Sequence, residues 1–190
     1  MAKPKVTYEA RELANYSEAM QRRNIATASQ LLEFSEVVAS RRLAESLRIE
    51  IGKPIYRVAI LRFANRVPVI LERVFVSCDR FPGLEEWDLE KSSVDDLLTD
   101  VYHIVPGQIS QTVEAVVATD TVAKQLRVEE GFPLLLVSRI VLGMQAEPLV
   151  FAQDFLRGDY SRVHTEAQLE ERSPMVHDET GKEEIEAGLP

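Results

Sequence analysis

Several polar side chains interrupt otherwise apolar segments, and their chemistry suits contact with a small polar molecule. Alternate residues of a strand share one face, so Arg62 lies on the same face as Tyr56, Val58 and Ile60. A buried arginine is costly unless it pairs with an acid or binds an anion. Arg62 is therefore the leading candidate for ligand contact. The alternative is an arginine at the strand edge whose guanidinium reaches water.

Two other segments carry polar residues at strand spacing. Asp154 alternates with apolar residues in 150–156, and Arg139 lies in the nearly apolar run 134–142. For Arg139 we favour a structural pair with a carboxylate such as Asp154 over ligand contact. Gln108 and Ser110 alternate with apolar residues along 108–117, which predicts a polar face over a cleft. The residues predicted to contact a ligand thus include Arg62, Gln108, Ser110 and Asp154.

The usual catalytic patterns are not found in the sequence. It has no Gly-x-Gly-x-x-Gly, phosphate loop, His-Glu-x-x-His or Gly-x-Ser-x-Gly motif. Its histidines, His103, His164 and His177, are scattered, and Cys78 is its single cysteine. We therefore predict no catalytic residue, no metal site and no cofactor, and we expect Cys78 to be an inert thiol.

Charge and length narrow the function class further. The net charge of the 190 residues is −9, and residues 166–190 carry eight acidic side chains against Arg172 and Lys182. No dense Lys/Arg stripe is present, so direct nucleic-acid binding by this chain is not expected. No apolar run approaches the roughly 20 residues of a membrane span, and the start is not a signal peptide. We expect a cytoplasmic protein that does not contact membranes.

A repeated segment predicts the architecture. Residues 44–55 recur as 123–134 at a constant offset of 79, and both copies end in Gly-x-Pro followed by an aliphatic residue. Glycine follows helix ends and proline cannot continue a helix, so each copy reads as helix, turn and strand. The pattern predicts a β-α-β-β unit twice, over about 26–76 and 108–156. Strands joined by tight turns pair antiparallel, which predicts an α+β fold with helices flanking the sheet.

The expected elements follow from periodicity and capping residues. Ser35 is the expected N-cap of the first repeated helix, Asp120 that of the second, and Ser93 with Asp96 forms a capping pattern between the copies. We predict helices over 8–24, from Ser35 to Leu47, after Ser93 and from Asp120 to Leu126, and strands over 26–34, 55–63, 68–76, 108–117, 134–142 and 148–156. The acidic residues after 163 are expected to be disordered.

Seven segments, in this order and spacing, resemble the UTRA domain, the effector-binding module of GntR-type transcriptional regulators of the HutC subfamily. They cover residues 13–163 and are Tyr16–Met20, Ala44–Tyr56, Leu61–Val69, Phe81–Leu84, Ser92–Leu98, Ala123–Leu135 and Arg157–Tyr160. The resemblance implies a chorismate-lyase-like fold, a small-molecule pocket and homodimers. It also implies that Ser93 contacts an anion at a helix start.

The chain departs from the family pattern at the pocket. Ile60 stands where many members have the first arginine of an Arg-x-Arg pair, Val150 replaces a common glutamate, and Leu156 replaces an aromatic residue. A further arginine that some members use against phosphate falls near Gln108. These substitutions favour an effector other than a sugar phosphate.

The resemblance divides the chain into an N-terminal extension (1–12), a UTRA-like domain (13–163) and an acidic tail (164–190). The extension is too short for a winged-helix domain, so DNA contact is expected only through a winged-helix domain absent from this chain. The leading hypothesis is a small-molecule-sensing, dimerising regulatory domain whose effector contacts Arg62, Ser93, Gln108, Ser110 and Asp154. The alternatives are a chorismate-lyase-like enzyme and a ligand-free dimerisation module.

Overall fold

The computed structural model describes residues 5–9, 20 and 23–166. Within them, the elements in chain order are β1 (Val6–Glu9), β2 (Thr27–Val38), α2 (Arg41–Leu47), β3 (Pro54–Ala64), β4 (Val67–Ser77), the 3-10 turn η2 (Leu84–Glu86), α3 (Val94–Asp100), β5 (Pro106–Val117), α4 (Asp120–Leu126), β6 (Pro133–Gly143), β7 (Pro148–Arg157) and β8 (Ser161–His164). None of the helices in this part of the chain is both long and apolar enough to span a membrane.

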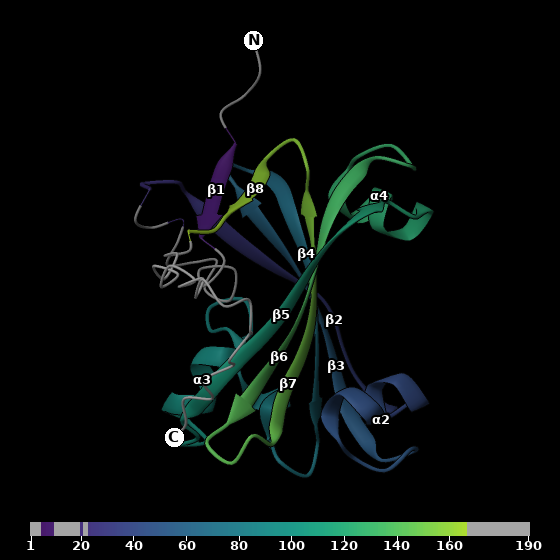
Figure 1. Cartoon of the computed structure of the whole chain (residues 1–190), viewed down its shortest axis with the longest axis vertical. Helices are drawn as coiled ribbons and strands as arrows, with labels where there is room; N and C mark the ends of the chain where they lie inside the picture. The colour runs from purple at the N-terminus through teal and green to yellow at the C-terminus, as the bar shows by residue number, and fades with distance from the viewer. Residues whose placement is uncertain (1–4, 10–19, 21–22, 167–190) are drawn as a thin grey trace, which may run out of the picture.

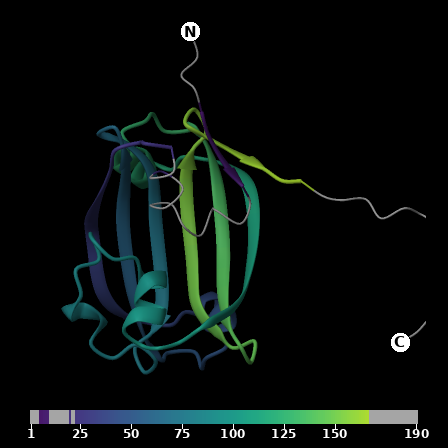
Figure 2. The same cartoon turned by 90° about the vertical axis from the view of Figure 1, so that its left-hand side faces the viewer.

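The centre of the fold is a twisted six-stranded sheet in the order β2-β3-β4-β7-β6-β5 (Figures 1 and 2). All of its pairs are antiparallel. The two predicted β-α-β-β units are β2-α2-β3-β4 and β5-α4-β6-β7, and they meet where β4 pairs with β7. The predicted fold class and its internal duplication are therefore confirmed.

The two copies of the repeated segment end their helices in the same way. Arg48 follows α2 with φ 49°, and Arg127 follows α4 with φ 55°. Gly52 and Gly131 then take φ values of 85° and 81°, which a residue without a side chain adopts at little cost. Each helix is thereby turned back onto the sheet, and the proline two residues later begins the next strand.

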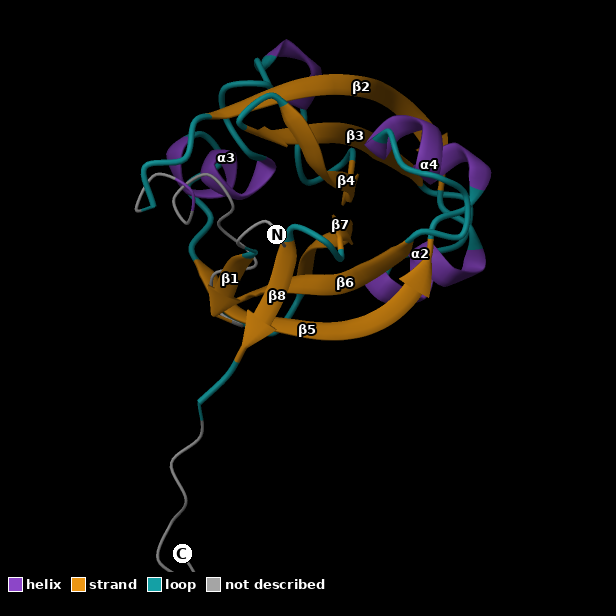
Figure 3. Cartoon of the chain, turned by 90° about the horizontal axis from the view of Figure 1, so that it is seen from above, coloured by secondary structure: helices purple, strands orange, loops and turns teal. Residues whose placement is uncertain are grey.

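Helices cover both faces of the sheet (Figure 3). We call one the α2/α4 face, where Leu47 of α2 and Leu126 of α4 are fully buried against the strands. The other is the α3 face, where Leu98 of α3 packs with Val58 and Val150. At the far end of the α3 face, β1 pairs in parallel with β8, with Val6 opposite Ser161. The sequence patterns did not predict this two-stranded sheet.

Three local predictions need correction. Strand β2 continues to Val38, so Ser35 lies inside the strand and donates to Glu33 Oε1 at 2.9 Å. The N-cap of α2 is Ser40, whose hydroxyl accepts from the amide of Leu43. Helix α4 begins after Thr119, and Asp120 lies in its first turn.

The predicted helix over 8–24 is wrong at both ends, since residues 8 and 9 belong to β1 and residues 23 and 24 form a turn. Residues 10–19 and 21–22, like the acidic tail beyond residue 166, lie outside the described part of the chain.

Candidate functional site

Five charged side chains meet on the α3 face and form what we call the charge cluster. Arg62 comes from β3, Glu72 from β4, Asp154 from β7, Arg139 from β6 and Asp95 from the first turn of α3. Directly opposed residues of antiparallel strands share a face, and Glu72 is opposite Asp154. The sheet register therefore brings together charges that are far apart in the sequence.

Arg62 is held by partners within the chain. It is 5% exposed, and its Nε and Nη2 donate to Glu72 Oε2 at 2.9 and 2.7 Å. Its Nη1 donates to the hydroxyl of Ser29 at 2.8 Å. These bonds rule out the alternative that Arg62 reaches water at the strand edge. Direct contact between Arg62 and an effector stays a prediction.

Arg139 joins the remaining acids. Its Nη2 donates to Glu72 Oε1 at 3.0 Å, its Nη1 donates to Asp95 Oδ2, and its Nε lies 3.5 Å from Asp154 Oδ2. The predicted pairing of Arg139 with Asp154 is present, but the contacts with Glu72 and Asp95 are shorter. The Oδ1 atoms of Asp95 and Asp154 are buried and have no hydrogen-bond partner among residues 5–9, 20 and 23–166.

Burial and neighbouring charges set the protonation of the acids in opposite directions. Burial alone would raise the pKa of Glu72, but attraction by Arg62 and Arg139 outweighs it and lowers that pKa. Burial raises the pKa of Asp154 to about 7, with Glu72 and Asp95 adding to the effect and Arg139 and Arg62 opposing it. Burial also raises the pKa of Asp95. Asp154 therefore exchanges its proton near neutral pH.

Ser93 fixes the start of α3 above the cluster. Its hydroxyl accepts from the amide of Asp96 at 3.1 Å and contacts Asp96 Oδ2 at 2.6 Å, while Asp96 Oδ2 also accepts from the amide of Ser93. The predicted capping pattern is therefore confirmed as a complete capping box. Leu97 and Leu98 seat the helix on the sheet. The cap orients Asp95, and anion contact by Ser93 stays a prediction.

Gln108 and Ser110 do not converge with Arg62. Ser110 is opposite Ile140 and Gln108 is opposite Leu142, so both face the α2/α4 side, and both are exposed. Strand β5 is an edge of the sheet, and its polar face points away from the cluster. Gln111, opposite Arg139, is the β5 residue on the cluster side.

Glu72 and Asp95 were missed as site residues. Glu72 alternates with Ile70 and Val74, so a charged side chain shares a strand face with apolar ones. This is the signal that identified Arg62, and applied to the next strand it also finds Glu72. Asp95 gave no such signal, because an acid in the first turn of a helix is common.

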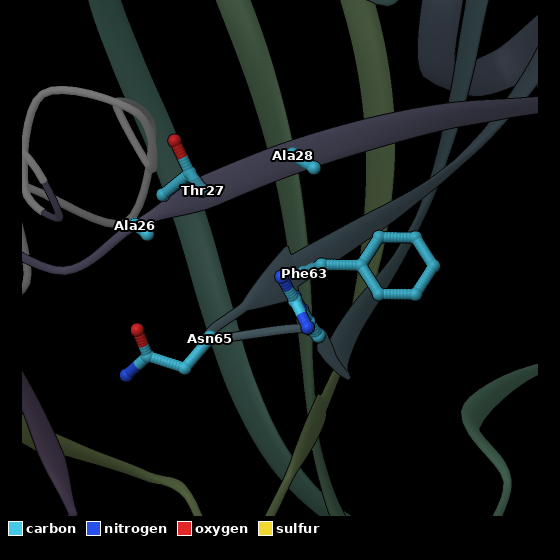
Figure 4. A pocket seen from close by; sticks show the side chains of 6 residues that line it. Ala26, Thr27, Ala28, Phe63 and Asn65 are labelled. Carbon is cyan, nitrogen blue, oxygen red and sulfur yellow. The ribbon is translucent and has the colours of Figure 1, made fainter.

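A pocket of about 480 Å³ lies elsewhere, between the start of β2 and the β3–β4 turn (Figure 4). It is lined by Ala26, Thr27, Ala28, Phe63, Asn65 and Arg66. None of the five cluster residues lines it. Its lining residues are exposed apart from the half-buried Phe63, so it is an open surface depression and a weaker candidate for specific recognition than the buried cluster.

Comparison with known proteins identifies relatives of the chain. The family model of the UTRA domain matches residues 22–162. The HTH-type transcriptional repressor NagR of Bacillus subtilis is 25% identical over 166 residues, which are 86% of this chain and 68% of that protein. The histidine utilization repressor of Pseudomonas aeruginosa is 27% identical over 139 residues, 73% of this chain and 55% of that protein. The chain thus spans about half to two thirds of these relatives.

Solved structures share the fold. PhnF from Mycobacterium smegmatis superposes with a TM-score of 0.81 and 21% identity, covering 90% of this chain and 75% of that one. The separately solved effector domain of PhnF superposes with a TM-score of 0.76 and 21% identity, covering 82% and 95%.

Proposed function

Because this chain belongs to the UTRA domain family, we propose that it is the effector-sensing, dimerising regulatory part of a cytoplasmic GntR/HutC-type transcriptional regulator. Its named relatives are transcriptional repressors, which supports a regulatory and non-enzymatic role. The proposed DNA contact is made by a helix-turn-helix domain outside residues 22–162.

The single observation that carries this proposal is the charge cluster beneath α3. Buried carboxylate oxygens without partners are costly, so the unpaired Oδ1 atoms of Asp95 and Asp154 favour a ligand that supplies donors. We place the effector against these two residues. Arg62 acts through Glu72, and Ser93 acts through the start of α3. Gln108 and Ser110 lie outside the proposed site.

Regulation then follows from movement of α3. An effector that bridges Asp95 on α3 and Asp154 on the sheet favours one position of the helix, and a dimer passes that change to its partner. Couplings of this kind are typically about 1–3 kcal/mol, enough for a change of about 5- to 150-fold in DNA affinity.

We propose that dimers form along β5. This 12-residue strand is a sheet edge, with no further strand beside it among the described residues. It exposes Ile109, Val113 and Val117 by 43%, 41% and 66%. A long apolar edge strand is a template for pairing with another chain, and a second copy offers the same strand in antiparallel orientation.

The proposal is tested by a thermal-shift screen of the full chain with amines, carboxylates, sugar phosphates and fatty acids. We expect at least one compound to raise the melting temperature in a dose-dependent way. Its amide chemical-shift changes should centre on α3, β6 and β7. If no compound acts and the chain still forms tight dimers, the ligand-free dimerisation module is the better description.

The enzymatic alternative is tested separately. A chorismate-lyase-type reaction needs arginines free to bind an anionic substrate, whereas Arg62 and Arg139 are engaged by Glu72, Asp95 and Asp154. We expect no pyruvate from chorismate. Release that scales with enzyme concentration and is lost in Arg139→Met would overturn the regulatory proposal.

A further inference from the structure

When all of its acids are ionised, the charge cluster holds more negative than positive charge. Among the described residues it combines three carboxylates, of Glu72, Asp95 and Asp154, with the two guanidiniums of Arg62 and Arg139. Glu72 bridges both arginines, so its charge is well compensated. The uncompensated charge therefore rests with Asp95 and Asp154, which share Arg139.

The unpaired oxygens belong to the same two residues. Asp154 is 6% exposed, and its Oδ1 finds no hydrogen-bond partner in the described part of the chain. Asp95 Oδ1 has no partner there either, but the Asp95 side chain is 17% exposed. Asp95, at the start of α3, is thus the more exposed of the two carboxylates, and both contact Arg139.

The hydrogen bonds already made within the charge cluster disfavour the binding of an anionic ligand group. Three of the Arg62 donors and the Nη1 and Nη2 groups of Arg139 already serve carboxylates or Ser29. The Ser93 hydroxyl is used in the capping box. An incoming phosphate or carboxylate would displace these acids and meet bare carboxylate oxygens.

Resting on the function proposed above, we propose that Asp95 and Asp154 together bind a cationic nitrogen of the effector, a primary ammonium or a guanidinium. Such a group brings both the positive charge and the hydrogen-bond donors that the two carboxylates require. A metal ion is a poorer match, because no acids, histidines or cysteines in the described residues are grouped to hold one.

The affinity for a cationic ligand should depend on pH, because its binding is linked to the protonation of Asp154. Asp154 faces Glu72 from β4, Arg139 from β6, Arg62 from β3 and Asp95 from α3, and its pKa is raised to about 7. Below that pH the free protein carries a proton on Asp154, which a cationic ligand must displace. Binding should therefore release a proton and tighten about tenfold between pH 6 and pH 8.

The test uses calorimetric titration of the full chain with matched probes. The cationic probes are ethanolamine, n-pentylamine and benzylamine, which stay protonated at pH 8, their neutral counterparts are the N-acetyl derivatives, and glucose 6-phosphate is the anionic probe. We expect at least one amine to bind at least tenfold more tightly than its N-acetyl form. Asp154→Asn and Asp95→Asn should each weaken that binding at least tenfold, and Asp154→Asn should remove its pH dependence.

Glu114→Gln is the matched control, because it removes an exposed carboxylate on the opposite face of β5 and should leave the affinity unchanged. Unfolding curves check that each variant folds. Equal binding of the amines and their N-acetyl forms, or binding of no amine, overturns the inference.

Binding of glucose 6-phosphate alone, strengthened by Asp154→Asn, also overturns the inference but leaves the proposed function standing. If the wider thermal-shift screen finds no ligand either, the proposed function fails as well.

Discussion

Glu72 is the residue that holds the charge cluster together. Its two oxygens bind different arginines, Arg62 through Oε2 and Arg139 through Oε1. Both guanidiniums are almost fully buried, so the loss of this carboxylate leaves them with too little compensation. Glu72 therefore stabilises the fold, while Asp95 and Asp154 are the carboxylates that we propose to bind a ligand.

Glu72→Gln should lower the free energy of unfolding by about 3–5 kcal/mol in urea denaturation. The matched control is Glu33→Gln, which breaks the half-exposed pair with Arg57 and should cost at most about 1 kcal/mol. If the two variants lose similar amounts of unfolding free energy, the buried network contributes no more to stability than the half-exposed ion pair.

The raised pKa of Asp154 predicts an unusual pH dependence of stability. Between about pH 4 and pH 7 the folded chain keeps a proton on Asp154 that the unfolded chain has lost, so the free energy of unfolding should fall as pH rises. Asp95 acts in the same direction, and the lowered pKa of Glu72 matters only below its unfolded value.

Urea titrations at pH 5 and pH 8 measure this effect. Asp154→Asn should flatten the difference between the two pH values relative to the unaltered chain. An unchanged difference would mean that Asp154 does not titrate in this range.

The sequence revealed part of the cluster, for identifiable reasons. Arg62, Arg139 and Asp154 each stand out as charges at alternating positions within apolar strands. Glu72 is also a charged residue at an alternating position in an apolar strand. Asp95, by contrast, is an acid in the first turn of a helix, where acids are common. Gln108 and Ser110 lie on the other face of the sheet from the cluster, because alternation separates the two faces of a strand but does not say which one meets the cluster.

At the scale of elements, α3 is the part of the fold that links the cluster to solvent. It has only seven residues, so its stability depends on its capping box and on its buried face. The capping box joins the side chains of Ser93 and Asp96. Asp95, which precedes Asp96 in the same turn, accepts a hydrogen bond from Arg139.

Ser93→Ala should therefore lower the free energy of unfolding by about 1 kcal/mol, the usual cost of a lost N-cap. We expect ligand affinity to change less than threefold. Ser46→Ala, which removes an exposed hydroxyl within α2, is the control and should have little effect. A large loss of affinity with unchanged stability would instead show that Ser93 contacts the effector.

Local patterns predicted most elements to within a few residues, because alternation and Gly-x-Pro joints are short-range signals. The end of β2 was missed because Ser35 and Ser40 are both able to cap a helix. Pairing with β3 decides between them, since Val38 is still opposite Pro54. The β1–β8 pair joins residues more than 150 positions apart, beyond the reach of any local pattern.

At the scale of the whole molecule, the duplicated sheet has two edges, β2 and β5. The proposed dimer uses β5, whose apolar residues recur every four positions on the α3 face. In a monomer, an exposed apolar edge strand tends to pair with strands of other chains and to aggregate. We therefore expect a defined partner to cover β5.

Val113→Lys should shift the chain from dimer to monomer in analytical ultracentrifugation, because a charged lysine in the middle of an edge strand opposes pairing. Met144→Lys is the control, since Met144 is 75% exposed in the β6–β7 turn. Dimers that persist in Val113→Lys, or that dissociate in both variants, would place the interface elsewhere.

The parallel pairing of β1 with β8 has a mechanical consequence. Strand β7, which carries Asp154, runs through a three-residue turn directly into β8, and the amide of Val6 donates to the carbonyl of Tyr160 at 2.7 Å. In a longer protein, β1 would connect this junction to any domain that precedes it in the sequence. A displacement of β7 would thus be transmitted through β8 and β1 to a domain attached N-terminal to β1. The path consists of a few covalent bonds and backbone hydrogen bonds, so the six-stranded sheet need not deform as a whole.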